Sequence, residues 1–295
     1  MTASAAPAQS EKPRLRLPLD WLGVAPFLLF ALLFLILPTM NIVIGAFQNP
    51  AGEFTLKNVQ GLFTPSIMAA YWISIRISLA SAILGCIVGF LMAAAVVLGG
   101  LPNWVRSPLL TFSGVASNFA GVPLAFAFIA TLGPIGLVTV FLRTQLGIDL
   151  RSLGFNLLSF WGLTLTYLFF QIPLMILIIT PALDGLKREW REAASILGAT
   201  GRQYWTMIAL PILFPSLLGT LALLFANAFG AVATAIALTG SSLSIVPILL
   251  FAQIRGDVLG DPHLGYALAF GMIVVTGIAN TIYIWLRARS ERWLK

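Results

Sequence analysis

Six long apolar segments run through the sequence, and they restrict its fold more than any other feature. Each is at least as long as the roughly 20 helical residues that cross a bilayer core. The segments are apolar throughout and do not alternate with polar residues, which is a poor match to membrane β-strands. We therefore predict an all-α membrane protein with six transmembrane helices. The predicted spans are Trp21–Phe47, Ile73–Leu98, Pro108–Leu132, Asn156–Pro181, Ile208–Leu238 and Tyr266–Leu286.

The composition agrees with this prediction and excludes several classes of protein. Hydrophobic residues make up 59% of the chain and charged residues 9%, whereas soluble domains carry about 45–50% apolar and about 25% charged residues. A soluble enzyme, a nucleic-acid-binding domain and a disordered protein are therefore excluded. The net charge of +7 comes from short basic runs between the apolar segments, so it indicates membrane topology. We expect membrane lipid, and no nucleic acid, among the partners.

The distribution of basic residues predicts how the chain is oriented. With the N-terminus in the cytoplasm, twelve of the 17 Lys and Arg residues lie inside and five outside, which places both termini in the cytoplasm. Residues 1–19 then form a flexible cytoplasmic tail, residues 20–290 one membrane domain and residues 291–295 a short cytoplasmic tail. A cleaved signal peptide is the alternative for the first segment, but that segment is too long and contains Pro26 and Pro38.

The predicted spans lack the residues that most chemistry requires. None of the ten acidic residues lies deep in a span, and Cys86 and His263 are the only residues of their types. No His-based metal site, nucleophile–base pair or phosphate-binding Walker A loop is present in the sequence. We expect no cofactor, no metal and no catalytic residue, so any ATP that drives this protein must be bound by another polypeptide.

Neutral polar residues within the spans are candidates for a translocation path. An amide is costly to bury without a partner, so Asn118 and Asn227 are the better candidates and Gln171 is a further one. In lipid such side chains also join helices through hydrogen bonds, and this alternative stays open for each of them.

The segment between the fourth and fifth spans predicts a short amphipathic helix. Leu186, Trp190, Ala193, Ala194 and Leu197 fall on one helical face. Gly198 and Gly201 provide stop and turn signals after the helix. From the residues alone, the helix either lies on the lipid surface or docks against a partner.

The same segment resembles a known motif. Glu192-Ala193-Ala194, three residues, Gly198, nine residues and then Ile208-x-Leu210-Pro211 match every fixed position of the EAA loop of binding-protein-dependent ABC importer permeases. The motif also precedes the fifth of six predicted spans, as in that family, and the similar layout covers about residues 20–290. The resemblance implies the type I importer (MetI-like) permease fold, a bacterial inner-membrane location and a coupling loop over residues 182–210.

The resemblance also implies roles and partners. It assigns docking and turn positions to Glu192, Ala193, Ala194 and Gly198, and anchoring positions to Ile208, Leu210 and Pro211. The implied partners are ABC ATPase subunits, a second permease (a heterodimer rather than a homodimer) and an extracytoplasmic solute-binding protein. A loose similarity over residues 239–270 to the spermidine/putrescine-like branch favours a polyamine or a related small solute. The alternative is a self-sufficient secondary carrier or channel.

Overall fold

The computed structural model describes residues 20–240, 242–255 and 262–291. The predicted tail over residues 1–19 lies outside the described residues, as does the predicted C-terminal tail apart from Glu291. Within the described part of the chain, every regular secondary-structure element is a helix, and one isolated antiparallel bridge joins Gln48 to Phe54. Six of the helical stretches are long and apolar enough to cross a membrane, which confirms the predicted fold class.

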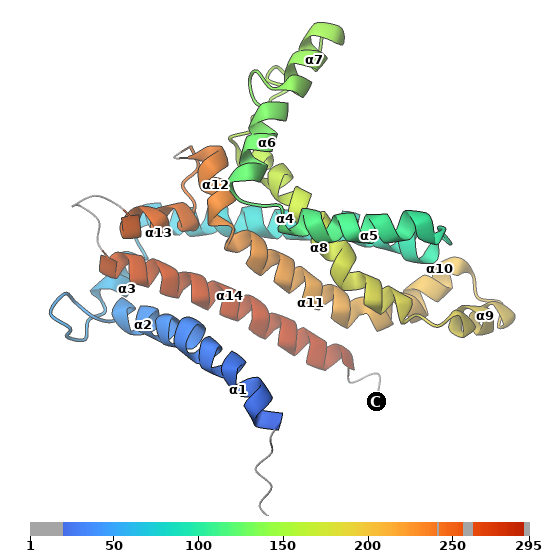
Figure 1. Ribbon diagram of the computed structural model, residues 1–295, viewed down its shortest axis with the longest axis horizontal. Coiled ribbons are helices and arrows are strands. Elements are labelled where there is room, and N and C mark those ends of the chain that lie inside the picture. Colours follow the sequence, from blue (N-terminus) through green and yellow to red (C-terminus); the bar gives the residue numbers. More distant parts are fainter. Residues whose placement is uncertain (1–19, 241, 256–261, 292–295) are drawn as a thin grey trace, which may run out of the picture.

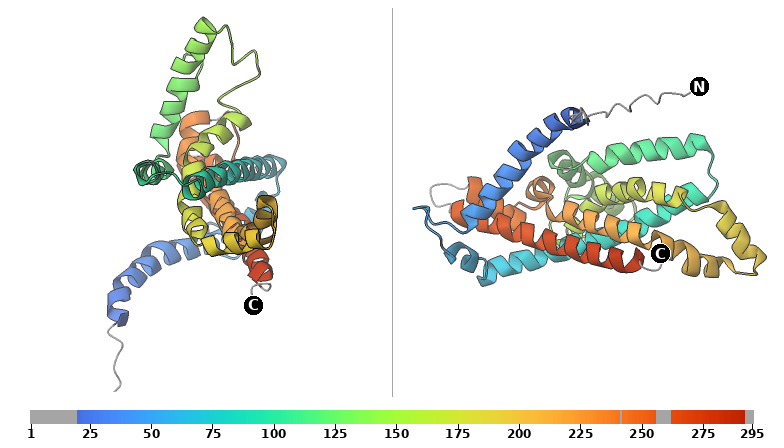
Figure 2. Two further views of the ribbon diagram at one scale, coloured as in Figure 1. Left: turned by 90° about the vertical axis from the view of Figure 1, so that its right-hand side faces the viewer. Right: turned by 90° about the horizontal axis from the view of Figure 1, so that it is seen from below.

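The first span lies at the edge of the molecule. It consists of α1 (Asp20–Ala31), a π-helical turn η1 (Leu32–Ile36) and α2 (Leu37–Ala46). The second half, α2, packs against α14 (Pro262–Glu291), whereas α1 leaves the bundle (Figures 1 and 2). A short helix, α3 (Lys57–Gly61), leads into the second span.

The centre of the bundle is formed by α4 (Pro65–Leu98), α8 (Phe160–Asp184), α11 (Leu210–Phe229) and α14. The most buried of the spans is α8, which packs most extensively against α4. Small residues permit this close packing, because a Cβ atom added at Gly89 would lie 2.6 Å from the Cβ atom of Met175. Leucines and isoleucines with exposed side chains cover the outer surface of these helices, as expected for surfaces that face lipid.

The prediction that the third span, Pro108–Leu132, is a single helix is wrong. The structure divides it into α5 (Asn103–Asn118) and α6 (Val122–Leu132). The first of these packs along α8, whereas α6 turns away and continues into α7 (Leu137–Gln145) (Figure 1). The break occurs because Gly121 has φ +77°, which is outside a helical conformation.

The fifth span is also bounded differently from the prediction. Its helix begins at Gly201, where α10 (Gly201–Tyr204), the π-helical turn η2 (Trp205–Ala209) and α11 form one continuous rod. The rod ends at Phe229, and a separate helix, α12 (Val232–Thr239), packs against α6. The next helix, α13 (Val246–Arg255), lies against α14. The predicted loop over residues 182–210 therefore contains α9 (Arg188–Ile196) and the beginning of the rod.

Candidate coupling site and translocation path

The amphipathic helix α9 lies at the end of the molecule opposite α3 and α13 (Figure 1). It begins after Lys187, whose backbone is extended, and it ends at Ile196. Ala194 is only 6% exposed and forms a small core with Tyr204 and Ala209, against which Leu186 and Trp190 pack. The coupling loop is therefore attached to the rod by its own apolar contacts.

Two successive local motifs set the angle between α9 and the rod. At the end of α9, the Ala199 N–H donates to the Ala194 carbonyl (2.9 Å) and the Gly198 N–H to the Ser195 carbonyl (3.0 Å). This is a Schellman motif, and Gly198 has the left-handed φ of +79° that the motif requires. A capping box between Thr200 and Gln203 then starts the rod. The fixed glycine of the sequence motif is therefore explained by backbone geometry.

The outward side of α9 combines a carboxylate with apolar groups. Glu192 and Ala193 are exposed, and the Glu192 carboxylate accepts a hydrogen bond from the Arg188 Nε atom (2.9 Å) on the same exposed surface. Ile196 and Leu197 are 85% and 86% exposed. Leu197 was predicted to continue the apolar face of this helix, but α9 ends at Ile196 and Leu197 is its C-cap. Ile196 was not predicted as a site residue, although the position of Gly198 indicates where the helix ends.

The anchoring positions lie where the loop joins the rod. Ile208 is half-buried and packs against the core of the loop. Leu210 and Pro211 are exposed, and Pro211 lies inside the continuous rod, directly after the π-helical turn η2. Ile208 therefore contacts the loop directly, whereas Leu210 and Pro211 continue the rod on its outer side.

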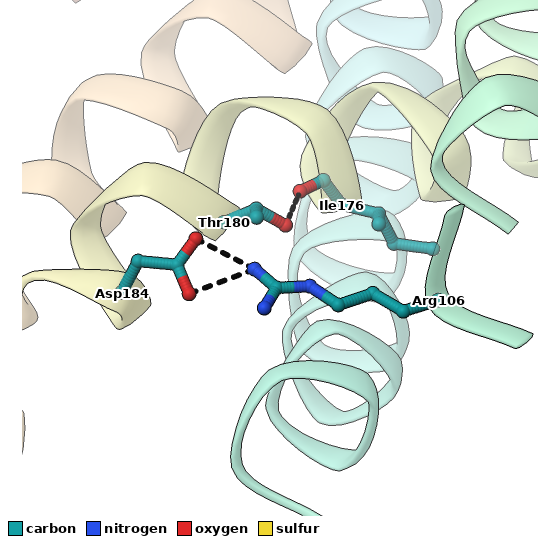
Figure 3. A network of polar contacts seen from close by, with 4 residues as sticks. All are labelled: Arg106, Ile176, Thr180 and Asp184. Atoms are coloured by element: carbon teal, nitrogen blue, oxygen red, sulfur yellow. Dashed lines mark hydrogen bonds and ion pairs between the residues drawn. The ribbon is translucent and has the colours of Figure 1, made fainter. Parts of the chain in front are cut away.

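An ion pair joins the base of the coupling loop to α5 (Figure 3). Asp184 is the last residue of α8, and its two carboxylate oxygens lie 2.8 Å and 2.7 Å from one guanidinium nitrogen of Arg106, in α5. The two residues are 78 positions apart in the chain, so sequence spacing does not reveal the pair. It connects the loop with the helix that ends at the break before Gly121.

The two helix breaks of the third and fifth spans contact each other. The Gly121 N–H, before α6, donates to the Thr234 hydroxyl of α12 (2.7 Å). The Tyr167 hydroxyl of α8 donates to the Ala231 carbonyl at the second break (2.9 Å). Each break also contains a tight turn, with bonds from the Ala120 N–H to the Asn118 carbonyl and from the Val232 N–H to the Gly230 carbonyl. The breaks are thus similar in form and joined by side chains.

A small cavity of about 250 Å³ opens at these breaks, and its lining carries no charged side chain. Asn227 lines it together with Ser117 and Thr234. Asn118 ends α5 beside the cavity, and its amide donates to the Gly114 carbonyl of its own helix (2.9 Å). The structure therefore brings both predicted asparagines to the breaks. Gly121, which was not predicted as a site residue, supports the same region, and the sequence Gly-Val-Pro that it begins is a signal for a helix break.

Gln171 has a different environment. It is fully buried between helices, where its Nε2 atom donates to the Leu224 carbonyl (2.8 Å) and its Cβ lies against Gly85. It does not line the cavity, and its contacts join α8 to α11. The described residues contain no group of three or more His, Cys, Asp or Glu side chains that could hold a metal ion.

Comparisons with known proteins agree with this architecture. Residues 88–295 match the family model described as "Binding-protein-dependent transport system inner membrane component". A probable sulfate transport system permease protein cysT from Nephroselmis olivacea is 27% identical over 90% of this chain and 89% of its own length. The putrescine transport system permease protein PotI from Escherichia coli (strain K12) is 25% identical over 90% of both chains.

Solved structures show the same fold. A bacterial ABC transporter involved in the import of the acidic polysaccharide alginate matches with a TM-score of 0.69 and 19% identity, over 94% of this chain and 97% of its own. The MetNI methionine ABC transporter in an inward-facing conformation matches with a TM-score of 0.51 and 13% identity, over 77% of this chain and 99% of its own. The chain belongs to the family of binding-protein-dependent transport system inner membrane components, and it is a multi-pass permease subunit of an ABC importer.

Proposed function

We propose that this chain forms, with a second permease, the path by which a small solute from an extracytoplasmic binding protein crosses the inner membrane. Partner ATPase subunits bind and hydrolyse the ATP, and the chain itself is non-catalytic. Both termini and α9 lie in the cytoplasm, and α9 is the element to which the ATPase subunits bind. The two permeases form a heterodimer.

The observation that carries this proposal is the connection between α9 and the helix breaks. The exposed Glu192, Ala193 and Ile196 form the outward tip of α9. Their helix is attached by a buried core to a rod that continues without interruption to Phe229, at the second break. A displacement of α9 by ATP binding would therefore reach the cavity through a stiff helix. Alternating access requires such differential contacts in two states.

The lining of the cavity supports a role in conducting the solute. It does not select the solute by charge. The named relatives are permeases for sulfate and for putrescine, which carry opposite charges. The cavity of this chain offers Asn227, Ser117 and Thr234, whose neutral groups can hydrogen-bond to either kind of solute. We propose that the binding protein selects the solute, and a polyamine or a related small solute is the substrate class.

The direct test is Glu192→Lys in the complete transporter reconstituted with its binding protein. We expect substrate-stimulated ATP hydrolysis and transport to fall at least tenfold, because a carboxylate at the docking tip becomes a cation, while the membrane fold is retained. Glu189→Lys is the matched control, since Glu189 is an exposed carboxylate of the same helix and lies outside the motif. Unchanged transport in Glu192→Lys would remove the coupling role, and solute flux without ATPase subunits would identify a self-sufficient carrier or channel instead.

A further inference from the structure

A second cavity, of about 590 Å³, lies between the end of α4 and the coupling loop. Its size is in the range of small-molecule sites, about 300–1,000 Å³. The α4 side contributes Val97, Leu98 and Gly100, and the loop side contributes a cluster of charged groups. The cavity is separate from the helix breaks, and the proposed function does not use it.

The charge of this cavity is strongly positive. Lys187, Arg188 and Arg191 line it together with one carboxylate, Glu192, which leaves a formal charge of +2. Arg188 pairs with Glu192, and the Lys187 ammonium lies 6.0 Å from the centre of the Trp190 ring. Arg191 makes no ion pair with any described residue. Two cations without a carboxylate partner therefore remain to attract an anion.

The side chains around the cavity favour a position near the membrane surface. Leu98 is the last residue of a 34-residue span, and Trp205, from the beginning of the rod, lines the cavity beside it. Nearby at the start of α5, Trp104 is 77% exposed. Tryptophans gather at the interface between hydrocarbon and water. One wall is thus apolar and the other cationic, a combination that suits a phospholipid whose headgroup lies at the membrane surface.

The helical geometry places this cavity and the apolar docking residues on different sides of α9. Arg191 and Ser195 line the cavity, whereas Ala193 and Ile196 do not. At 3.6 residues per turn, these two groups occupy nearly opposite sides of α9. Arg191 therefore faces the end of α4, and Ala193 and Ile196 face away from it. Glu192 lies between these two sides of α9, where it is exposed and also lines the cavity.

We propose that this cavity binds the phosphate group of an anionic phospholipid of the adjacent leaflet. The apolar wall formed by Val97, Leu98 and Trp205 receives the beginning of an acyl chain, and Lys187 and Arg191 contact the phosphate. Basic pockets between membrane helices bind anionic headgroups in this way. Such a lipid would lie against the base of the coupling loop and favour one position of α9.

The experiment measures lipid binding directly, so its result is independent of transport. The purified complete transporter in detergent is titrated with phosphatidylglycerol or phosphatidylcholine, and bound lipid is counted by native mass spectrometry. We expect a preference for phosphatidylglycerol that falls about fivefold in Arg191→Gln and further in Lys187→Gln/Arg191→Gln, since each cation near a membrane surface contributes about 1 kcal/mol. Lys187→Arg/Arg191→Lys should keep the preference. Arg202→Gln, an exposed cation of the same loop outside the cavity, is the matched control.

Four outcomes would overturn the proposal. Equal binding of the two lipids, or unchanged binding in Arg191→Gln, would show that the cavity does not discriminate between lipid headgroups. Displacement of the lipid by millimolar glycerol phosphate or inorganic phosphate would assign the site to a soluble anion. Loss of the ATPase subunits from Arg191→Gln with lipid binding unchanged would assign the cations to subunit docking.

Discussion

The coupling loop and the paired helix breaks both interrupt helices, but they are stabilised in different ways. In the loop, the Schellman and capping-box bonds join residues at most five positions apart. At the breaks, the bonds of Thr234 and Tyr167 join residues 113 and 64 positions apart. The loop thus holds its shape through its own sequence, whereas the breaks depend on the packing of α6, α8 and α12.

This difference suits the two roles in the proposed cycle. An element that transmits a displacement must keep its shape while it moves. The local capping bonds can stay intact while α9 and the rod move together. A gate must instead change its contacts, and single bonds between separate helices can be exchanged between two states. The predictions below test whether changes in the coupling loop and changes at the helix breaks affect stability and transport differently.

The largest effect on stability is expected for Thr234→Val. This change leaves the half-buried Gly121 N–H without its partner, and a donor left unsatisfied away from water costs about 1–3 kcal/mol. The free energy of unfolding, measured by titration with a denaturing detergent, should fall by that amount, and transport should fall with it. Thr220→Val is the matched control, because Thr220 is equally buried and its hydroxyl donates only to the Ser216 carbonyl of its own helix. Equal losses in the two variants would show that the bond between the breaks contributes nothing specific.

How far the sequence predicts the fold depends on the same distinction. Hydrophobic length was sufficient to predict six spans, since a bilayer imposes that length on any helix. It was insufficient to divide Pro108–Leu132 into α5 and α6, because both halves are apolar and the break follows from Gly121 and a partner in α12. The end of the fifth span at Phe229 was missed for a similar reason, as its neighbour Ala231 is held by Tyr167.

For the candidate site, the local motif was readable and the long-range contacts were not. Gly198 was predicted as a turn residue, and its positive φ explains why glycine stands there. The ion pair of Arg106 with Asp184 has no local signal, because it forms only when α5 and α8 pack together. Gln171 was grouped with the asparagines on chemistry alone, and only the packing of α8 against α4 and α11 distinguishes it from them.

A smaller effect is expected for Gly198→Ala. Nothing lies within 4 Å of an added Cβ, so the cost is confined to the left-handed backbone, about 1–2 kcal/mol. Gly198→Asn should cost less, since asparagine tolerates this conformation better. Thermal unfolding of the purified transporter would rank the variants, and coupling of ATP hydrolysis to transport should follow the same order. A ranking in which alanine equals glycine would mean that the Schellman turn does not set the angle of α9.

The smallest effect on stability is expected for the pair of Arg106 and Asp184, which lies between the two regions. The side chains are 30% and 45% exposed, and exposed pairs contribute about 0.2–1 kcal/mol. A double-mutant cycle with Arg106→Gln and Asp184→Asn should give a coupling energy in that range, and salt should reduce it. If the pair transmits movement from the loop to α5, the swap Arg106→Asp/Asp184→Arg should restore the transport that each single charge reversal removes. A swap that restores stability but not transport would separate the two roles and leave α8 and the rod as the links between the coupling loop and the breaks.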